Sequence, residues 1–299
     1  MTRALALAQK RGDPAEIIFQ LSHARLVAQG AGDFAVSTAL TDRILGLAER
    51  EASTASLELA YGTQVQERYR YGDLVGAEKF FGLWSQLPAP RQHPHWVVPV
   101  MLAGGPAVWY LGHPEKALAR IAEAIIFAES RNAYEMAMAQ TAEGELSRLL
   151  RQPARSERSA MDAMSISDEH GLSFFREWAR MIVGWARAQL GRTEEGVALI
   201  REGLAGLTQI GANAVRATGR PNLLLAEDFA KNGFTDDALS AIDDGLRQAN
   251  PSEPFHQPAL LNCRGELRLK MGAPDLAEAD FRNGIAFSQK LSAKGWSCV

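Results

Sequence analysis

The chain has 299 residues, of which 46% are hydrophobic and 22% are charged, and its formal net charge is −3. This composition is typical of a globular protein and excludes a disordered or fibrous chain. The small negative charge excludes a global basic field that would attract nucleic acid or an anionic membrane. The two cysteines, Cys263 and Cys298, are too few for a disulfide framework, which favours a reducing, cytoplasmic location.

The N-terminal residues 1–14 contain one short apolar run. It meets Lys10 and Arg11 too early for a secretory signal peptide, so we predict the end of a helix there. The most apolar segment, residues 97–112, is interrupted by Pro99 and Pro106 and is shorter than the roughly 20 residues that a membrane span requires. We therefore expect neither a membrane span nor a membrane partner.

Helix-breaking residues recur along the chain at intervals of about 40 residues. They are Gly32, Gly72, Gly112, Gln152, Gly191, Gly233 and Gly272. Helix-start residues such as Asp, Thr, Pro and Glu follow each of them. Five residues after each breaker the chain has a small residue, except at Glu157: the set is Ser37, Ala77, Ala117, Glu157, Gly196, Ala238 and Ala277. Nine residues after it, most side chains are large and apolar, as in Phe81, Ile121, Met161, Ile200, Ile242 and Phe281.

This pattern predicts a helix, a tight turn and a second helix in each repeat. Small residues allow the two helix backbones to approach closely, and no alternation typical of strands occurs. Because one helix pair cannot cover its own apolar face, the pairs must stack. We predict an all-α solenoid, a right-handed superhelix of about seven antiparallel helix pairs in one domain spanning 1–299. The predicted repeats are 14–49, 54–86, 95–130, 133–169, 172–210, 213–249 and 254–292; the fourth fits least, because of Glu157 and a one-residue slip at Gly144.

The spacing resembles the tetratricopeptide repeat, lengthened from its usual 34 residues to about 40. Residues 184–207, 219–246 and 263–296 are similar to the C-terminal repeats of large bacterial signalling proteins. In those proteins a class III adenylate or guanylate cyclase, a protein kinase or a transcription-factor domain is joined to a P-loop ATPase module and then to the repeats. The chain departs from them at Leu261 and Asn262, where a His-Arg pair is usual, and over residues 131–170.

This resemblance implies a non-catalytic sensor or regulatory module that binds a protein or peptide segment. Residues 1–13 look like the tail of a second helix, and residues 292–299 look like the start of a first helix. We therefore expect a piece of a longer array or a diverged remnant; the alternative is a self-contained protein whose uncapped ends are covered by self-association or by a partner. A second reading is the repeat segment of an ATPase-type transcriptional regulator, and a third is a helical enzyme whose site no motif reveals.

Sequence motifs for catalysis are missing. No Gly-x4-Gly-Lys-Ser/Thr loop occurs, which excludes the ATPase module from this chain, and no cofactor is expected. His93 and His95 form the one close histidine pair, and two ligands are too few for zinc. Cys263 has no nearby histidine, so we interpret it as a buried small apolar residue. The arginines at 151, 155 and 158 alternate with acidic residues, as on a solvated helix face, and do not indicate nucleic-acid binding.

In stacked helix pairs of this kind the first helices line the concave surface, which binds partners. When the repeats are aligned on their helix-breaking residues, the following residues are predicted to lie on the concave surface: Gln66, Arg70, Trp109, Tyr110, Arg148, Trp178, Trp185, Gln189, Arg220, Glu227, Lys231, Asn262, Glu266 and Lys270. Tryptophan and arginine often anchor interfaces. The tryptophans would bury an apolar side chain of the partner, and Arg220 and Lys231 would pair with carboxylates. The alternative is that Trp178 and Trp185 simply pack between repeats.

Overall fold

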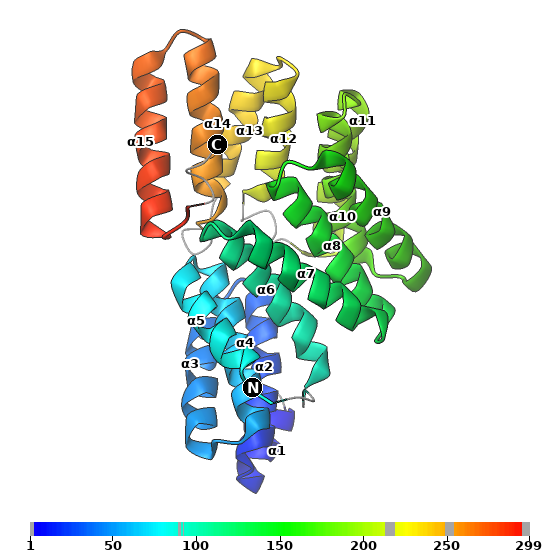
Figure 1. Ribbon diagram of the computed structural model, residues 1–299, viewed down its shortest axis with the longest axis vertical. Helices are drawn as coiled ribbons and strands as arrows, with labels where there is room; N and C mark the ends of the chain where they lie inside the picture. Colours follow the sequence, from blue (N-terminus) through cyan, green and yellow to red (C-terminus); the bar gives the residue numbers. More distant parts are fainter. Residues whose placement is uncertain (1–2, 89–90, 92, 213–218, 249–253, 295–299) are drawn as a thin grey trace.

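The computed structural model describes residues 3–88, 91, 93–212, 219–248 and 254–294. These residues form fifteen α-helices, one 3-10 helix and no strand. The helices are α1 (Arg3–Arg11), α2 (Pro14–Gly30), α3 (Phe34–Glu51), α4 (Thr54–Arg70), α5 (Leu74–Ser85), η1 (Pro94–Trp96), α6 (Val97–Tyr110), α7 (Pro114–Glu129), α8 (Ala133–Leu149), α9 (Pro153–His170), α10 (Ser173–Gln189), α11 (Thr193–Gln209), α12 (Arg220–Lys231), α13 (Thr235–Gln248), α14 (His256–Lys270) and α15 (Pro274–Lys290). From α2 onward they stack as seven antiparallel pairs (Figure 1).

The turn inside each pair is set by a residue in the left-handed region. All six predicted glycine breakers have a positive φ, between 75° at Gly272 and 93° at Gly191. Only glycine adopts this conformation without strain, so the chain reverses there. An acidic cap then starts two of the second helices: the carboxylate of Asp33 accepts from the N–H of Val36, and that of Asp73 accepts from the N–H of Gly76. The turns were therefore correctly predicted from the glycines.

The fourth breaker was placed one residue too late. The left-handed residue of this repeat is Arg151, with φ 56°, and not Gln152. Counted from Arg151, the small position is Ser156, which is fully buried and donates from its hydroxyl to the carbonyl of Gly144 at 2.8 Å. Glu157, one position further along α9, is half-buried and pairs with Arg187 and Arg192. The apparent slip at Gly144 thus disappears, since this repeat uses an arginine where the others use glycine.

Small residues bring the helices of a pair together, as predicted. Between α10 and α11, a Cβ on Gly184 would lie 2.6 Å from the carbonyl oxygen of Gly196, and a Cβ on Gly196 would lie 2.5 Å from that of Gly184. Ile200 fills the space beside them and is fully buried. This approach is closer than any side chain permits, so the two backbones are in direct contact.

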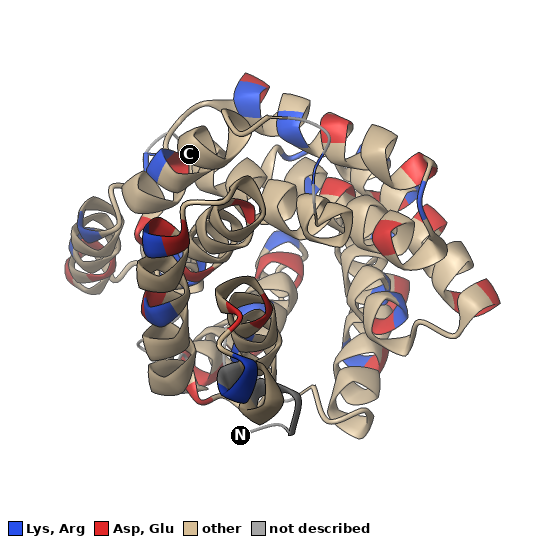
Figure 2. Cartoon of the chain, turned by 90° about the horizontal axis from the view of Figure 1, so that it is seen from below, with Lys and Arg blue, Asp and Glu red and all other residues tan. Residues whose placement is uncertain are grey.

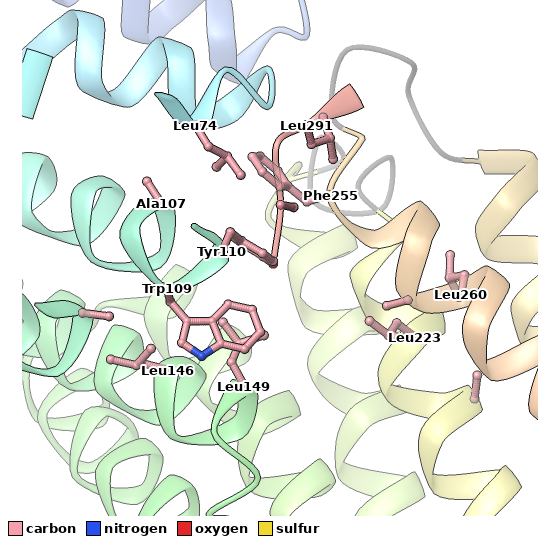
Figure 3. Close-up of a cluster of buried hydrophobic side chains, with 14 of the residues drawn as sticks. Leu74, Ala107, Trp109, Tyr110, Leu146, Leu149, Leu223, Phe255, Leu260 and Leu291 are labelled. Carbon is pink, nitrogen blue, oxygen red and sulfur yellow. The ribbon is translucent and has the colours of Figure 1, made fainter. Parts of the chain in front are cut away.

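The even-numbered helices α2 to α14 form the inner layer, where each packs against the next even-numbered helix. The array curls so far that its last pair returns to the first half (Figure 1). Phe255, just before α14, stacks on Tyr69 of α4 and Tyr110 of α6, with ring centroids 4.9 Å and 5.2 Å away. Leu291, after α15, packs into the same cluster near Leu74 (Figure 3). We call this contact the closing seam.

The ends of the chain follow the sequence pattern in part. A helix precedes the first pair, namely α1. Residues 291–294 lie outside any helix, and the backbone N–H of Lys294 donates to the carbonyl of Tyr110 at 2.6 Å. The remainder of the predicted final helix, with Cys298, lies outside the described residues. Among the helices that are described, none has the length and apolar character to span a membrane.

Candidate functional site

Two hollows lie where the sequence predicted the concave face. We call the first the C-terminal groove; its volume is about 570 Å³. It is lined by Arg151, Gln189, Glu227, Ala230, Lys231, Ala259, Asn262, Cys263, Glu266, Lys270, Phe281 and Ile285. The second, the central pocket, has a volume of about 320 Å³. It is lined by Gln29, Gln66, Tyr69, Arg70, Pro99, Leu102, Ala103, Met138, Trp178, Arg220, Phe255 and His256.

The predicted residues divide between these hollows and the interior. Six line the C-terminal groove: Gln189, Glu227, Lys231, Asn262, Glu266 and Lys270. Four line the central pocket: Gln66, Arg70, Trp178 and Arg220. Four others are buried, with exposed fractions of 8% for Trp109, 2% for Tyr110, 1% for Arg148 and 1% for Trp185. Trp185 therefore packs between repeats, as the alternative interpretation proposed, whereas Trp178 lies at the wall of the central pocket.

Buried charges connect the groove with the pocket. Arg148 of α8 donates to Glu145 at 2.8 Å and lies 3.6 Å from Glu227 of α12, which borders the groove. Arg220, at the pocket, lies 3.7 Å from the same Glu145. The indole N–H of Trp185 donates to Glu227 at 2.8 Å. Residues from α8, α10 and α12 thus form one network, in which each buried charge faces an opposite charge.

This network determines the ionisation of its members. Burial alone would raise the pKa of Glu145, but the charges of Arg148 and Arg220 outweigh it and lower that pKa to about 2. Burial would likewise lower the pKa of Arg148, and Glu145 and Glu227 reverse this and raise it above its usual value. Both groups are therefore charged at neutral pH. Sequence analysis missed Glu145, although its position one turn before Arg148 on α8 is a signal for an ion pair.

Asp228 lies beside this network as a buried carboxyl group. It is fully buried, accepts from the Gln189 amide at 3.1 Å through Oδ1, and has no partner for Oδ2. Burial raises the pKa of its carboxyl to about 8. No sequence signal marks Asp228, because its burial results from the packing of α12 against α10.

The described residues offer little catalytic chemistry. They contain no group of three or more His, Cys, Asp or Glu side chains that could hold a metal ion. Burial raises the pKa of the Cys263 thiol to about 12, so it is not a thiolate at neutral pH. Figure 2 shows positive and negative residues interspersed over the helices. The arrangement is suited to holding a ligand through charges and apolar contacts.

Comparison with known proteins rests on structure. No family model matches the chain, and no curated protein matches it in sequence. A solved Rap protein, complexed with Competence and Sporulation Factor, superposes with a TM-score of 0.70 at 10% identity over 93% of this chain and 87% of that one. The apo form of RapI superposes with a TM-score of 0.65 at 10% identity, over 92% and 98% of the two chains. The fold is a tetratricopeptide-like α-solenoid.

A third structure has a similar fold. It is a signal transduction ATPase with numerous domains that carries a tetratricopeptide repeat sensor, from Pyrococcus horikoshii. The TM-score is 0.57 at 10% identity, and the match covers 96% of this solenoid but 44% of that chain. At such identities the likeness establishes the fold alone.

Proposed function

We propose that the chain is a non-catalytic scaffold that binds an extended peptide or protein segment in the C-terminal groove. The observation that carries this proposal is a row of unpaired polar groups on α14. Asn262, Glu266 and Lys270 are spaced one helical turn apart and line the groove, and their side chains make no hydrogen bond or ion pair with any described residue. The opposite side of the groove ends on Glu227 and Lys231.

Such a groove has the chemistry that an extended segment requires. The side-chain amide of Asn262 can donate to and accept from a backbone, whose N–H and C=O groups are free in an extended chain. Glu266 and Lys270 offer one charge of each sign. The lining also includes the apolar side chains of Ala259, Phe281 and Ile285, which would contact one apolar side chain of the segment.

We further propose that binding serves regulation, with the chain acting as the sensor or regulatory repeat module of a cytoplasmic bacterial signalling protein. Two of the structural neighbours support this: one Rap protein is complexed with Competence and Sporulation Factor, and one ATPase carries a tetratricopeptide repeat sensor. A cyclase, ATPase or transcriptional output domain linked to the solenoid remains part of this proposal, as does self-association through the terminal repeats.

The test is a selection of random peptides displayed on phage against the full chain, followed by fluorescence anisotropy with the selected peptides. We expect Asn262→Ala and Lys270→Ala each to weaken binding by about tenfold, the effect of losing one good interface contact. Asn283→Ala on the exposed side of α15 and Lys116→Ala on α7 are the matched controls and should bind as the wild type does. Failure to select any peptide, or equal binding by all four variants, would contradict the proposal.

A further inference from the structure

We propose that the C-terminal groove takes an extended segment with one basic and one acidic residue two positions apart. The basic side chain faces Glu266 and the acidic side chain faces Lys270. This proposal rests on the function proposed above and names the chemistry of the bound segment. Two features of the inner face carry it, namely the spacing of these charges on α14 and the occurrence of the same pair of charges on α12.

The spacing of the two charges matches an extended chain. Glu266 and Lys270 are four residues apart on α14, so their side chains leave the same face of the helix, one turn apart. Four residues of α-helix rise about 6 Å, and two residues of an extended strand advance about 6.6 Å. Side chains two positions apart on an extended chain also point to the same side. A segment lying along α14 therefore places two of its side chains opposite both charges at once.

The other charged residues that line the groove already have partners within the protein. Arg151 pairs with Glu227, with 3.1 Å between the guanidinium Nη2 and the carboxylate Oε1. Lys231 donates from its ammonium group to the backbone carbonyl of Gln189. The two charges of α14 are exposed and pair neither with each other nor with any other residue that the structure describes. They are therefore the charges of the groove that a bound segment can neutralise.

The preceding inner helix, α12, carries the same two charges in the same register. Glu227 and Lys231 precede Gly233, the turn glycine of their helix pair, by six and two residues. The two charges of α14 precede Gly272, the turn glycine of the last pair, by the same intervals. Because α12 and α14 pack side by side as inner helices, these residues take equivalent positions on the inner face. The pair on α12 therefore shows which groups this arrangement binds.

On α12 the acidic member of the pair binds basic groups and the basic member binds an oxygen. The carboxylate of Glu227 lies 3.1 Å from the guanidinium of Arg151 and 3.6 Å from that of Arg148, and it accepts from the indole N–H of Trp185 at 2.8 Å. Lys231 donates to a backbone carbonyl oxygen. Opposite charges and a hydrogen-bond acceptor thus satisfy the pair.

The repeat pattern explains why the pair on α14 lacks such partners. Arg151 is the left-handed turn residue of its repeat, and Arg148 stands three residues before it. In the next repeat these two positions are Gly191 and Ala188. Neither has a charged side chain, so the equivalent positions provide no guanidinium for Glu266. A bound segment that provides a basic group there, with an acidic group opposite the lysine one turn further along, completes the arrangement seen on α12.

The experiment uses the full chain and the tightest peptide from the phage selection, with affinity measured by fluorescence anisotropy. We expect this peptide to contain a basic and an acidic residue two positions apart. Glu266→Lys and Lys270→Glu should each weaken its binding about tenfold or more, with an unchanged circular dichroism spectrum because both residues are exposed. Glu115→Lys and Lys116→Glu make the same charge changes on exposed positions of α7 and should leave the affinity unchanged.

Compensating changes in the peptide assign each charge. Replacing its basic residue with glutamate should restore binding to Glu266→Lys and not to Lys270→Glu, and replacing its acidic residue with lysine should do the reverse. A glycine inserted between the two charged residues should weaken binding about tenfold, because it turns their side chains to opposite sides of an extended chain. A glycine added at the end of the peptide should have no such effect.

The outcomes separate this proposal from the one on which it rests. Selected peptides that lack the charged pair, full affinity in both charge-reversal variants, or no rescue by the compensating peptides would overturn the dipolar segment, while the selection itself would still support a peptide-binding scaffold. Failure to select any peptide contradicts the scaffold and the dipolar segment together.

Discussion

The close contact between α10 and α11 makes Gly196→Ala a test of the packing rule that repeats along the chain. The new methyl group would lie 2.5 Å from the carbonyl oxygen of Gly184 and 2.7 Å from Cβ of Ala188, where carbon contacts are optimal at about 3.5–4.0 Å. Because one of these partners is backbone, rotation of a side chain cannot relieve the overlap. Overpacking of this kind costs up to about 3 kcal/mol. The higher helix propensity of alanine offsets about 1 kcal/mol of this cost, so the free energy of unfolding should fall by about 2 kcal/mol.

The matched control is Gly82→Ala in α5, where an added methyl group would meet no atom within 4 Å. At that position no steric overlap offsets the gain in helix propensity, so Gly82→Ala should raise the free energy of unfolding by about 1 kcal/mol. Urea unfolding followed by helical circular dichroism measures both variants against the wild type. The urea concentration at the midpoint of unfolding should be lower for Gly196→Ala and higher for Gly82→Ala than for the wild type. If Gly196→Ala is as stable as Gly82→Ala, the small residues are not required for close helix approach and the reasoning fails.

Three further predictions concern buried charge and the closing seam. Arg148→Met should destabilise the chain by about 3–5 kcal/mol in urea unfolding, because Glu145 loses its main partner in the interior; a change under about 1 kcal/mol would contradict the network. The pKa of Asp228 is 3.8 in an unfolded chain and about 8 when folded, so the folded state retains a proton and stability falls as the pH rises through that window. Asp228→Asn should flatten this part of a melting profile measured from about pH 4 to 8, and an unchanged slope would refute the assignment. Leu291→Asp places a charge in the seam and should increase the radius of gyration in X-ray scattering, whereas Leu276→Asp on the exposed face of α15 should not.

The helix pairs were predictable because their determinants are local. The glycine at the left-handed turn and the small residue five positions later both determine the structure of a single helix pair. Each can be recognised in the sequence from its residue type alone. The fourth repeat shows the limit of this rule. There Arg151 adopts the left-handed conformation itself, held by the helices on both sides, and no residue type announces it. The prediction therefore chose Gln152, the residue before the proline that starts α9.

The candidate site was predicted less well, because the inner face of a helix both borders a hollow and packs against the next inner helix. Part of it borders the hollow, as Arg70 and Asn262 do, and part packs against the next inner helix, as Trp185 does when it donates to Glu227. The periodicity of the sequence identifies the inner face, but it does not show which residues of that face border a hollow and which pack between helices. That division depends on how far each pair is rotated from the one before.

The closing seam depends on the same rotation, summed over the whole array. Phe255 reaches Tyr69 and Tyr110 only because several successive pairs curl the chain back on itself, although each pair is specified by residues within about 40 positions. A small change in rotation per pair would separate these rings without altering any local signal. The seam and the central pocket beside it are therefore properties of accumulated geometry. Their residues come from elements far apart in sequence, which explains why the repeat register marked Gln66 as part of the inner face but nothing in the sequence marked His256.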